Sequence, residues 1–248
     1  MSHVVNILKR SAHENFFNRV AHTADILWIC STNIASLLHH LQWLSLHSND
    51  IDEWPSLPSK PNLRSMFLGD NRVSHLSDGA FSNLHNLTSL DLDQNCIVEV
   101  DRHAFPTSLQ TLSLSNNLMM QVPTAALHNL RNLTWLQIGG NLIEQLPRPF
   151  RLPVKQLHKL DLSHNLLTRL PSAFMNDSDV VTISNLHLEF NYIKDLYEST
   201  FKRLSPGKTI IVKQQAFHHS GWYIRWSPRH SQGTGFESQL VGDFSKGS

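Results

Sequence analysis

The chain has 248 residues, which is long enough to bury a sizeable hydrophobic core. Its 21 Lys and Arg residues nearly balance 20 Asp and Glu residues, and a net charge of +1 gives no electrostatic basis for binding nucleic acid or an anionic membrane. Two cysteines are too few for a disulfide scaffold, and the apolar run 26–30 is too short for a membrane span or a signal-peptide core.

Residues 1–40 do not carry a regular pattern. Leu27, Ile29 and Ile34 are compatible with one degenerate repeat, but Thr32 lies only 17 residues before the first regular asparagine, Asn49. We therefore expect this segment to be a degenerate N-terminal repeat or a poorly ordered cap.

A repeat begins at residue 41 and continues to residue 204. Seven asparagines follow one another at intervals of 22–26 residues, each in the frame LxxLxLxxNxL. These positions are Asn49, Asn71, Asn95, Asn117, Asn141, Asn165 and Asn191. Seven matches in one frame predict a solenoid of seven stacked repeats.

The frame has a direct structural meaning. In LxL the two leucines point to one face of a short strand and the residue between them points to the other face. One repeat cannot bury its leucines alone, so stacked copies form a parallel sheet over a continuous core. The asparagine amide ends each strand, where it can bond backbone groups of adjacent turns that would otherwise be buried and unpaired.

The second half of each repeat also recurs. An aromatic residue or leucine follows most of the asparagines after nine or ten residues, at Phe81, Phe105, Leu127, Phe150, Phe174 and Phe201. We expect these side chains to fill the core on the side away from the sheet, where proline after Val122, Leu146 and Leu170 ends the strand side.

Together, LxxLxLxxNxLxxLPxxAF at about 24 residues resembles the typical subclass of leucine-rich repeats over residues 41–204. Stretches such as Asn185–Asn191 look most similar to chaoptin-like adhesion proteins. The resemblance implies an α/β fold, a curved horseshoe with a short-stranded parallel sheet on its concave face and turns or short helices on its convex face. The cysteine-rich caps of the family are absent, so we expect an internal fragment or an incomplete gene model.

The open sheet face is the predicted binding surface. Aromatic side chains at solvent positions favour a protein partner because such residues dominate binding hot spots. Charged residues on the same face would set charge complementarity and association rate. The predicted partner-binding residues are Trp43, Phe67, Asp91, Asp93, Trp135, Lys159, Asp161 and His187.

The remaining motifs concern glycosylation and possible phosphate, catalytic and metal sites. Three sequons predict N-glycosylation at Asn86, Asn132 and Asn176. Pro206-Gly207-Lys208-Thr209 lacks the earlier glycine of a phosphate loop, and Asp91 with Asp93 has no pocket or base, so we predict no enzyme and no cofactor. His164 and His187 lie on adjacent predicted strands, but two ligands do not make a structural zinc site, and we predict no metal.

Residues 205–248 are rich in Gly, Ser, His and basic residues, and we expect a flexible non-repeat tail. The leading hypothesis is a cell-surface or secreted recognition module that binds a protein, by homophilic or heterophilic contact, without nucleic acid and without inserting into the membrane. The alternative is a cytoplasmic leucine-rich-repeat scaffold or regulatory subunit, which the low cysteine count favours.

Overall fold

The computed structural model describes residues 42–54, 62–148, 150, 152–154, 156–171, 182–194, 209–211 and 224–225. The chain divides into two compact units. Unit 1 comprises Met1–Leu118 and Pro123–Asn132, and unit 2 comprises Met119–Val122 and Leu133–Ser248. The predicted N-terminal segment 1–40 lies outside the described residues.

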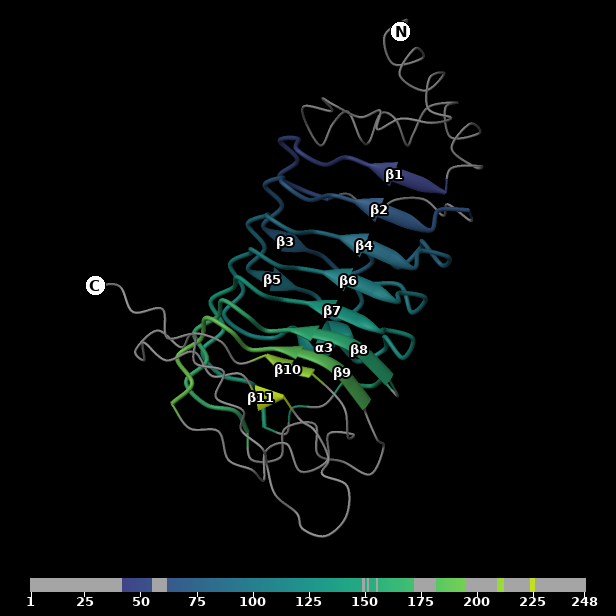
Figure 1. Cartoon of the computed structure of the whole chain (residues 1–248). Coiled ribbons are helices and arrows are strands. Elements are labelled where there is room, and N and C mark those ends of the chain that lie inside the picture. The colour runs from purple at the N-terminus through teal and green to yellow at the C-terminus, as the bar shows by residue number, and fades with distance from the viewer. Residues whose placement is uncertain are drawn as a thin grey trace, which may run out of the picture. The chain divides into compact units, whose positions relative to one another are not determined.

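Unit 1 contains four parallel strands of three residues each, stacked in chain order (Figure 1). They are β1 (Trp43–Ser45), β2 (Ser65–Phe67), β4 (Ser89–Asp91) and β6 (Thr111–Ser113). The register aligns the second leucine position of each repeat, at Leu44, Met66, Leu90 and Leu112. The strands therefore follow the repeat frame of the sequence.

Unit 2 continues the same pattern with β7 (Trp135–Gln137), β8 (Gln156–Asp161) and β9 (Thr182–His187), which are parallel and in register. A further parallel strand, β10 (Thr209–Ile211), pairs with β9, and β11 (Ile224–Arg225) pairs antiparallel with β10.

These last two strands lie in the segment 205–248, for which the sequence predicts a tail without repeat structure. The physical reason for the difference is that the last repeat strand presents unpaired backbone groups, which a β-branched segment such as 209–211 can satisfy.

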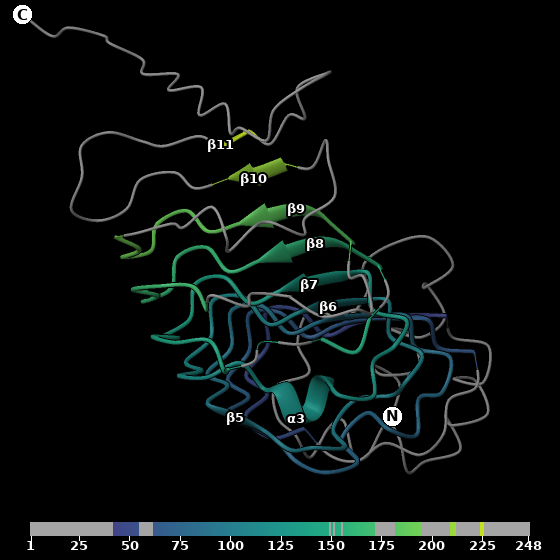
Figure 2. The ribbon, with the colours of Figure 1, turned by 90° about the horizontal axis from the view of Figure 1, so that it is seen from below.

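The side opposite the main sheet of unit 1 contains short elements. Two-residue strands β3 (His75–Leu76) and β5 (Glu99–Val100) pair in parallel, and α3 (Thr124–Leu127) is a single turn that begins after Pro123. Figure 2 shows α3 across the unit from β6. Proline is well tolerated at a helix start because the first N–H groups have no partner within the helix. No helix among the described residues is long and apolar enough to span a membrane.

The core lies between the sheet and these turns. Most frame leucines in the described part of the chain are almost fully buried, while Leu44 on β1 is half-buried. Phe81, Phe105 and Phe150 are also buried, which confirms that these aromatic residues belong to the core. In unit 1, Trp54 stacks on Phe81 with ring centroids 5.3 Å apart, and Phe81 stacks on Phe105 at 6.4 Å. Phe174 and Phe201 lie outside the described residues.

The repeat asparagines form a ladder beneath the strand ends. Asn95 is typical: its Nδ2 donates to the carbonyls of Leu92 at 3.1 Å and of Leu68 in the preceding repeat at 3.0 Å. Its Oδ1 accepts from the backbone N–H of Val73 at 3.1 Å. One side chain thus satisfies backbone groups of two adjacent turns. These groups need a partner from the protein because water does not reach them in the core.

The residue before each ladder asparagine turns the chain sharply. Six of these residues are not glycine and have φ between 51° and 56°, and the seventh is Gly140 with φ 64°. This left-handed conformation is uncommon for residues with a side chain. The structure therefore confirms the predicted fold class of a leucine-rich-repeat solenoid, built from one backbone turn repeated in both units.

Candidate partner-binding surface

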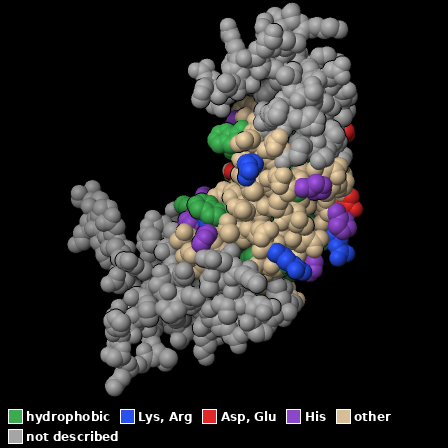
Figure 3. Space-filling view, turned by 90° about the vertical axis from the view of Figure 1, so that its right-hand side faces the viewer, with side chains coloured by type: hydrophobic (Ala, Val, Ile, Leu, Met, Phe, Trp, Pro, Cys, Tyr) green, Lys and Arg blue, Asp and Glu red, His purple; other side chains and the backbone are tan. Residues whose placement is uncertain are grey.

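We define the sheet face as the face of the main strands opposite the buried leucines. It presents the variable residues of each repeat, and two tryptophans stand out on it. Trp43 is 69% exposed and Trp135 is 46% exposed, whereas Leu136 beside Trp135 is fully buried and Leu44 beside Trp43 is half-buried. Figure 3 shows scattered hydrophobic side chains on the described surface, with histidine and charged side chains among them.

In unit 1 the aromatic residues form a pair. The rings of Trp43 and Phe67 are 5.8 Å apart between centroids and tilted by 58°, in the range where aromatic pairs attract each other. Phe67 is half-buried, and strand register places it beside Asp91 on β4. Unit 1 therefore combines an aromatic platform with a neighbouring carboxylate on the sheet face.

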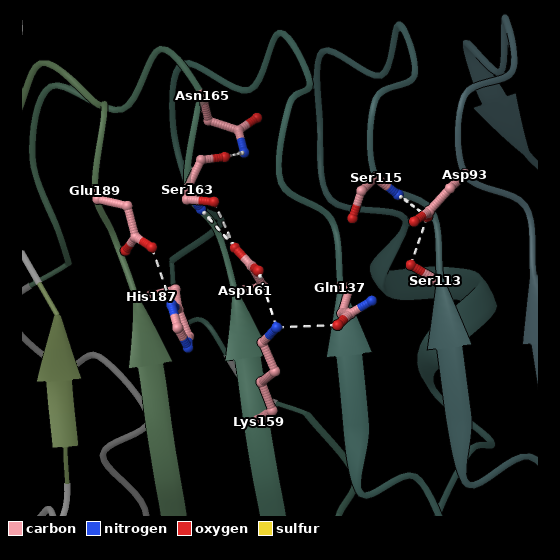
Figure 4. Close-up of polar contacts among 10 residues, drawn as sticks. All are labelled: Asp93, Ser113, Ser115, Gln137, Lys159, Asp161, Ser163, Asn165, His187 and Glu189. Carbon is pink, nitrogen blue, oxygen red and sulfur yellow. Dashed lines mark hydrogen bonds and ion pairs between the residues drawn. The ribbon is translucent and has the colours of Figure 1, made fainter.

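The predicted acids Asp91 and Asp93 lie close together in unit 1, and both accept hydrogen bonds. Figure 4 shows the bonds that Asp93 accepts. The Oδ1 atom of Asp93 accepts from the hydroxyl of Ser113 at 2.5 Å and from the backbone N–H of Ser115 at 2.8 Å. The N–H of Asp93 donates to Oδ1 of Asp91 at 2.9 Å. Asp93 thus ties two adjacent repeats together in addition to contributing negative charge.

In unit 2 the corresponding positions form a mixed network. Strand register places Lys159 beside the exposed Trp135. The Nζ atom of Lys159 donates to Oε1 of Gln137 at 3.0 Å and lies 3.3 Å from Oδ2 of Asp161. The Oδ1 atom of Asp161 accepts from the backbone N–H of Ser163 at 3.1 Å and from its hydroxyl at 2.6 Å (Figure 4).

These contacts keep Asp161 ionised. Burial by itself raises the pKa of this carboxyl, but the hydrogen bonds from Ser163 and the charge of Lys159 together outweigh it and hold the pKa below its ordinary value. Asp161 therefore presents a fixed negative charge near neutral pH, and Lys159 presents a positive charge next to it.

The last pair on the sheet face of unit 2 is His187 and Glu189. The Nδ1 atom of His187 lies 3.0 Å from Oε1 of Glu189, while Oε2 of Glu189 is buried without a hydrogen-bond partner. His164, which the sequence places on the adjacent strand, does not contact His187 in the described hydrogen bonds; its ring stacks on Phe190 with centroids 4.1 Å apart. No group of three metal-ligating side chains occurs among the described residues.

A separate polar cluster lies on the other side of unit 1, next to β3 and β5. His75 Nε2 lies 3.1 Å from Asp101 Oδ1, and Asp101 Oδ2 accepts from the N–H of Asp78 at 3.1 Å. Asp78 in turn accepts from the N–H of His103 at 2.9 Å, and this bond is the main reason why the pKa of Asp78 is low. The cluster links adjacent repeats at an exposed position.

The eight predicted binding residues therefore divide into two groups, one in each unit. Sequence reasoning missed the supporting residues Ser113, Ser163 and Glu189. The spacing Asp161-Leu162-Ser163 is a usable signal for one of them, because a hydroxyl two residues after an acid can reach it on the same strand face. The Asp93–Ser113 contact joins different strands and has no such local signal.

The structure describes two of the three sequon asparagines. Asn86 and Asn132 are both exposed in unit 1, and Asn176 lies outside the described residues.

Comparison with known proteins gives two matches to leucine-rich-repeat families, at residues 61–107 and 156–176. No curated protein matches the chain. Among solved structures, human 5T4 (Wnt-activated inhibitory factor 1, trophoblast glycoprotein) has a TM-score of 0.57 and 24% identity, over 71% of this chain and 70% of that protein. InlP from Listeria monocytogenes has a TM-score of 0.53 and 23% identity, over 69% of this chain but only 43% of its own length. At these identities the similarity establishes the shared solenoid fold.

Proposed function

We propose that this leucine-rich-repeat protein binds another protein through its sheet face, as a recognition module of a cell-surface or secreted protein. The observation that carries the proposal is the exposure of Trp43 and Trp135 on the sheet face, opposite buried frame leucines such as Leu46 and Leu136. In the proposal, the seven repeats between residues 41 and 204 form the binding module, and it acts by binding rather than by catalysis.

The physical basis is the combination of a rigid support and adaptable side chains. Ladder asparagines such as Asn117 and Asn165 hold each turn by buried hydrogen bonds, so the strands lose little conformational freedom when a partner binds. Tryptophan is the residue most enriched in binding hot spots, because it combines a large apolar area with a hydrogen-bond donor. The anchors are therefore held in place before the partner arrives.

Charged residues would then select the partner. On unit 2, Lys159 and Asp161 are only 22% and 18% exposed at their side chains and neutralise each other, so they favour a partner with paired charges of its own. On unit 1, Asp91 beside the aromatic pair favours a partner that brings a cation. Adhesion, by homophilic or heterophilic contact, is the finer function that the repeat resemblance supports.

The test compares tryptophan variants with a matched exposed apolar residue off the sheet face. The full chain would be assayed by surface plasmon resonance against a panel of purified cell-surface ectodomains and against itself. We expect Trp43→Ala or Trp135→Ala to weaken the affinity for a bound ectodomain roughly 30-fold, about 2 kcal/mol, as hot-spot residues do. Val98→Ala, at 54% exposure, is the control and should leave the affinity unchanged.

Equal effects of Val98→Ala and of both tryptophan variants would reject the sheet face as the binding surface. Sedimentation velocity of the unliganded chain at increasing concentration tests the homophilic form, because homophilic contact requires the sedimentation coefficient to rise with concentration.

A second candidate, an intracellular scaffold, is favoured by one observation. Cys96 is an exposed free thiol, which is typical of a reducing compartment rather than of an oxidising one. The sheet face would bind a protein in either case. Fractionation of the native source separates the two candidates, since a cytosolic protein without glycan would overturn the cell-surface proposal.

A further inference from the structure

The edge of unit 1 at which the strands begin has a repeated polar position. It is the residue immediately before the first leucine of the frame, occupied in the described part of this unit by Asn62, Asn86, Ser108 and Asn132. We call this edge the leading edge. Ser108 Oγ donates to the carbonyl of Leu87 at 2.7 Å, and Asn132 Nδ2 donates to the carbonyl of Thr107 at 3.3 Å.

These two bonds join neighbouring repeats at the leading edge, with one acceptor just after and the other just before the leading-edge residue of the preceding repeat. Two residues later the backbone bonds recur, because the N–H of Thr88 donates to the carbonyl of Arg64 at 2.8 Å and the N–H of Gln110 donates to the carbonyl of Thr88 at 2.8 Å. The backbone that follows the leading-edge residue is therefore bonded in the same way in these repeats.

Two of the four positions carry complete sequons. Asn86-Leu87-Thr88 and Asn132-Leu133-Thr134 have the required Asn-x-Thr pattern, and both asparagines are exposed. In each sequon the middle leucine is buried at 0–1% exposure while the asparagine before it stays at the surface. A group attached to the asparagine would therefore point outward without disturbing the core.

We propose that Asn86 and Asn132 carry N-linked glycans that stand together on the leading edge of unit 1. In the reaction, the Nδ2 atom forms a bond to C1 of the first sugar of a lipid-linked oligosaccharide diphosphate. The bond between C1 and the diphosphate oxygen breaks, the lipid diphosphate leaves, and the amide loses one proton.

The modified amide remains compatible with the observed structure. An unmodified asparagine amide has two N–H groups, and a glycosylated one keeps one of them. Asn132 can therefore retain its bond to the carbonyl of Thr107 after modification. The glycans leave the sheet face open because the exposed Trp43 and the acid Asp91 lie on the strands themselves, not on the edge that precedes them.

The inference uses the exported form of the proposed function, but its test does not depend on it. The full chain would be secreted from cultured animal cells with a supplied leader peptide, and glycans would be removed with an amidase in ¹⁸O-labelled water. Peptide mass spectrometry then reports each glycosylated asparagine as labelled aspartate. We expect label at both Asn86 and Asn132, with Asn176 scored separately.

Matched variants test the geometry of the edge. Thr88→Ala should remove the label from Asn86 alone, while Thr88→Ser keeps the sequon and the hydroxyl and should keep the label. Arg64→Thr creates a new sequon at exposed Asn62, the equivalent position of an earlier repeat, and should add one glycan. Thermal melting of each secreted variant confirms that the chain is folded.

An unlabelled Asn86 or Asn132 in the folded, secreted chain would overturn the proposal, and so would failure of Arg64→Thr to add a glycan at Asn62. Because the leader is supplied, such a failure would leave the protein-binding proposal intact. Conversely, loss of sheet-face binding in the tryptophan assay would leave these glycan sites intact.

Discussion

The sheet faces of the two units are built on the same repeat frame but have different chemistry. On unit 1 the variable strand positions carry hydroxyls, an aromatic pair and the acids Asp91 and Asp93, without a Lys or Arg among them. On unit 2 they carry Trp135, a network of Gln137, Lys159 and Asp161, and His187 paired with a carboxylate. Unit 1 presents net negative charge, and unit 2 presents paired charges.

The difference shows that the residues of the repeat frame and the residues of the sheet face can vary independently of each other. Leucines and asparagines point inward and set the backbone, so the residues between them can change charge without changing the fold. A residue of the sheet face that also supports the backbone would be an exception to this separation.

The largest expected effect is loss of a ladder asparagine, which should be the same in both units. Asn117 bonds the carbonyls of Leu92 and Leu114 and the N–H of Ile97, and Asn165 makes the equivalent bonds in unit 2. Replacing either by alanine leaves buried backbone groups unpaired and should lower the free energy of unfolding by about 3 kcal/mol. Urea denaturation measures this, with exposed Asn129→Ala as a control that should change it by less than about 0.5 kcal/mol. A clear difference between the two units would show that the ladder does not support them equally.

Two glycines of the sheet face should respond differently to alanine. A Cβ at Gly139 in unit 2 would lie 3.0 Å from Ser163 Oγ and 3.1 Å from both Asp161 Oδ1 and the Ser163 carbonyl. A Cβ at Gly69 in unit 1 would mainly meet the exposed ring of His47, at 2.7 Å, which can rotate away. We expect Gly139→Ala to destabilise by about 1–3 kcal/mol and Gly69→Ala by about 1 kcal/mol or less in the same denaturation assay. The reverse order would contradict the tighter packing of the unit 2 network.

Removal of the Ser163 hydroxyl should produce a pH-dependent loss of about 1 kcal/mol. Because hydrogen bonds lower the pKa of Asp161 in the folded state, its ionised form stabilises the fold above the ordinary value of 3.8, and this contribution is lost as the pH falls through the folded pKa. Ser163→Ala raises that pKa towards its ordinary value. The stability difference from the parent chain should therefore be largest at pH 7 and shrink by pH 3, as measured by urea denaturation. An equal difference at both pH values would mean that the hydroxyl does not act through the charge of Asp161.

The smallest effect is expected at the turn before the ladder. Gly140 has φ 64°, whereas the equivalent residues Gln94 and Asn116 in unit 1 adopt φ 54° and 53° without being glycine. Asparagine tolerates this conformation well, so Gly140→Asn should change the free energy of unfolding by less than about 1 kcal/mol. A larger loss in thermal melting would indicate that this turn of unit 2 differs from the turns of unit 1.

Much of the candidate surface could be predicted from the sequence, since residues such as Trp43 and Trp135 occupy fixed positions between leucines. Their exposure follows from the alternation of a strand. The partners of the charged residues could not be predicted, because they depend on which atoms of neighbouring strands come within hydrogen-bonding distance. Asp93 was predicted as a charge for recognition, yet it also accepts bonds from Ser113 and Ser115 on the next repeat.

In the segment 205–248 a strand also depends on contacts that leave no local pattern in the sequence. Its sequence has no repeat frame, and β10 forms there because β9 leaves an unpaired strand edge beside it.

By itself, then, the sequence determined the repeat, the strand positions, the buried leucines and the asparagine ladder, because each follows from a local period and from the need to bury apolar area. Only the tertiary structure decided which side chains on the sheet face pair across neighbouring repeats and which of their acids accept bonds from the next repeat. The reason is that contacts such as Asp93–Ser113 and Lys159–Gln137 join residues about one repeat apart, whose distance is set by the stacking of the strands.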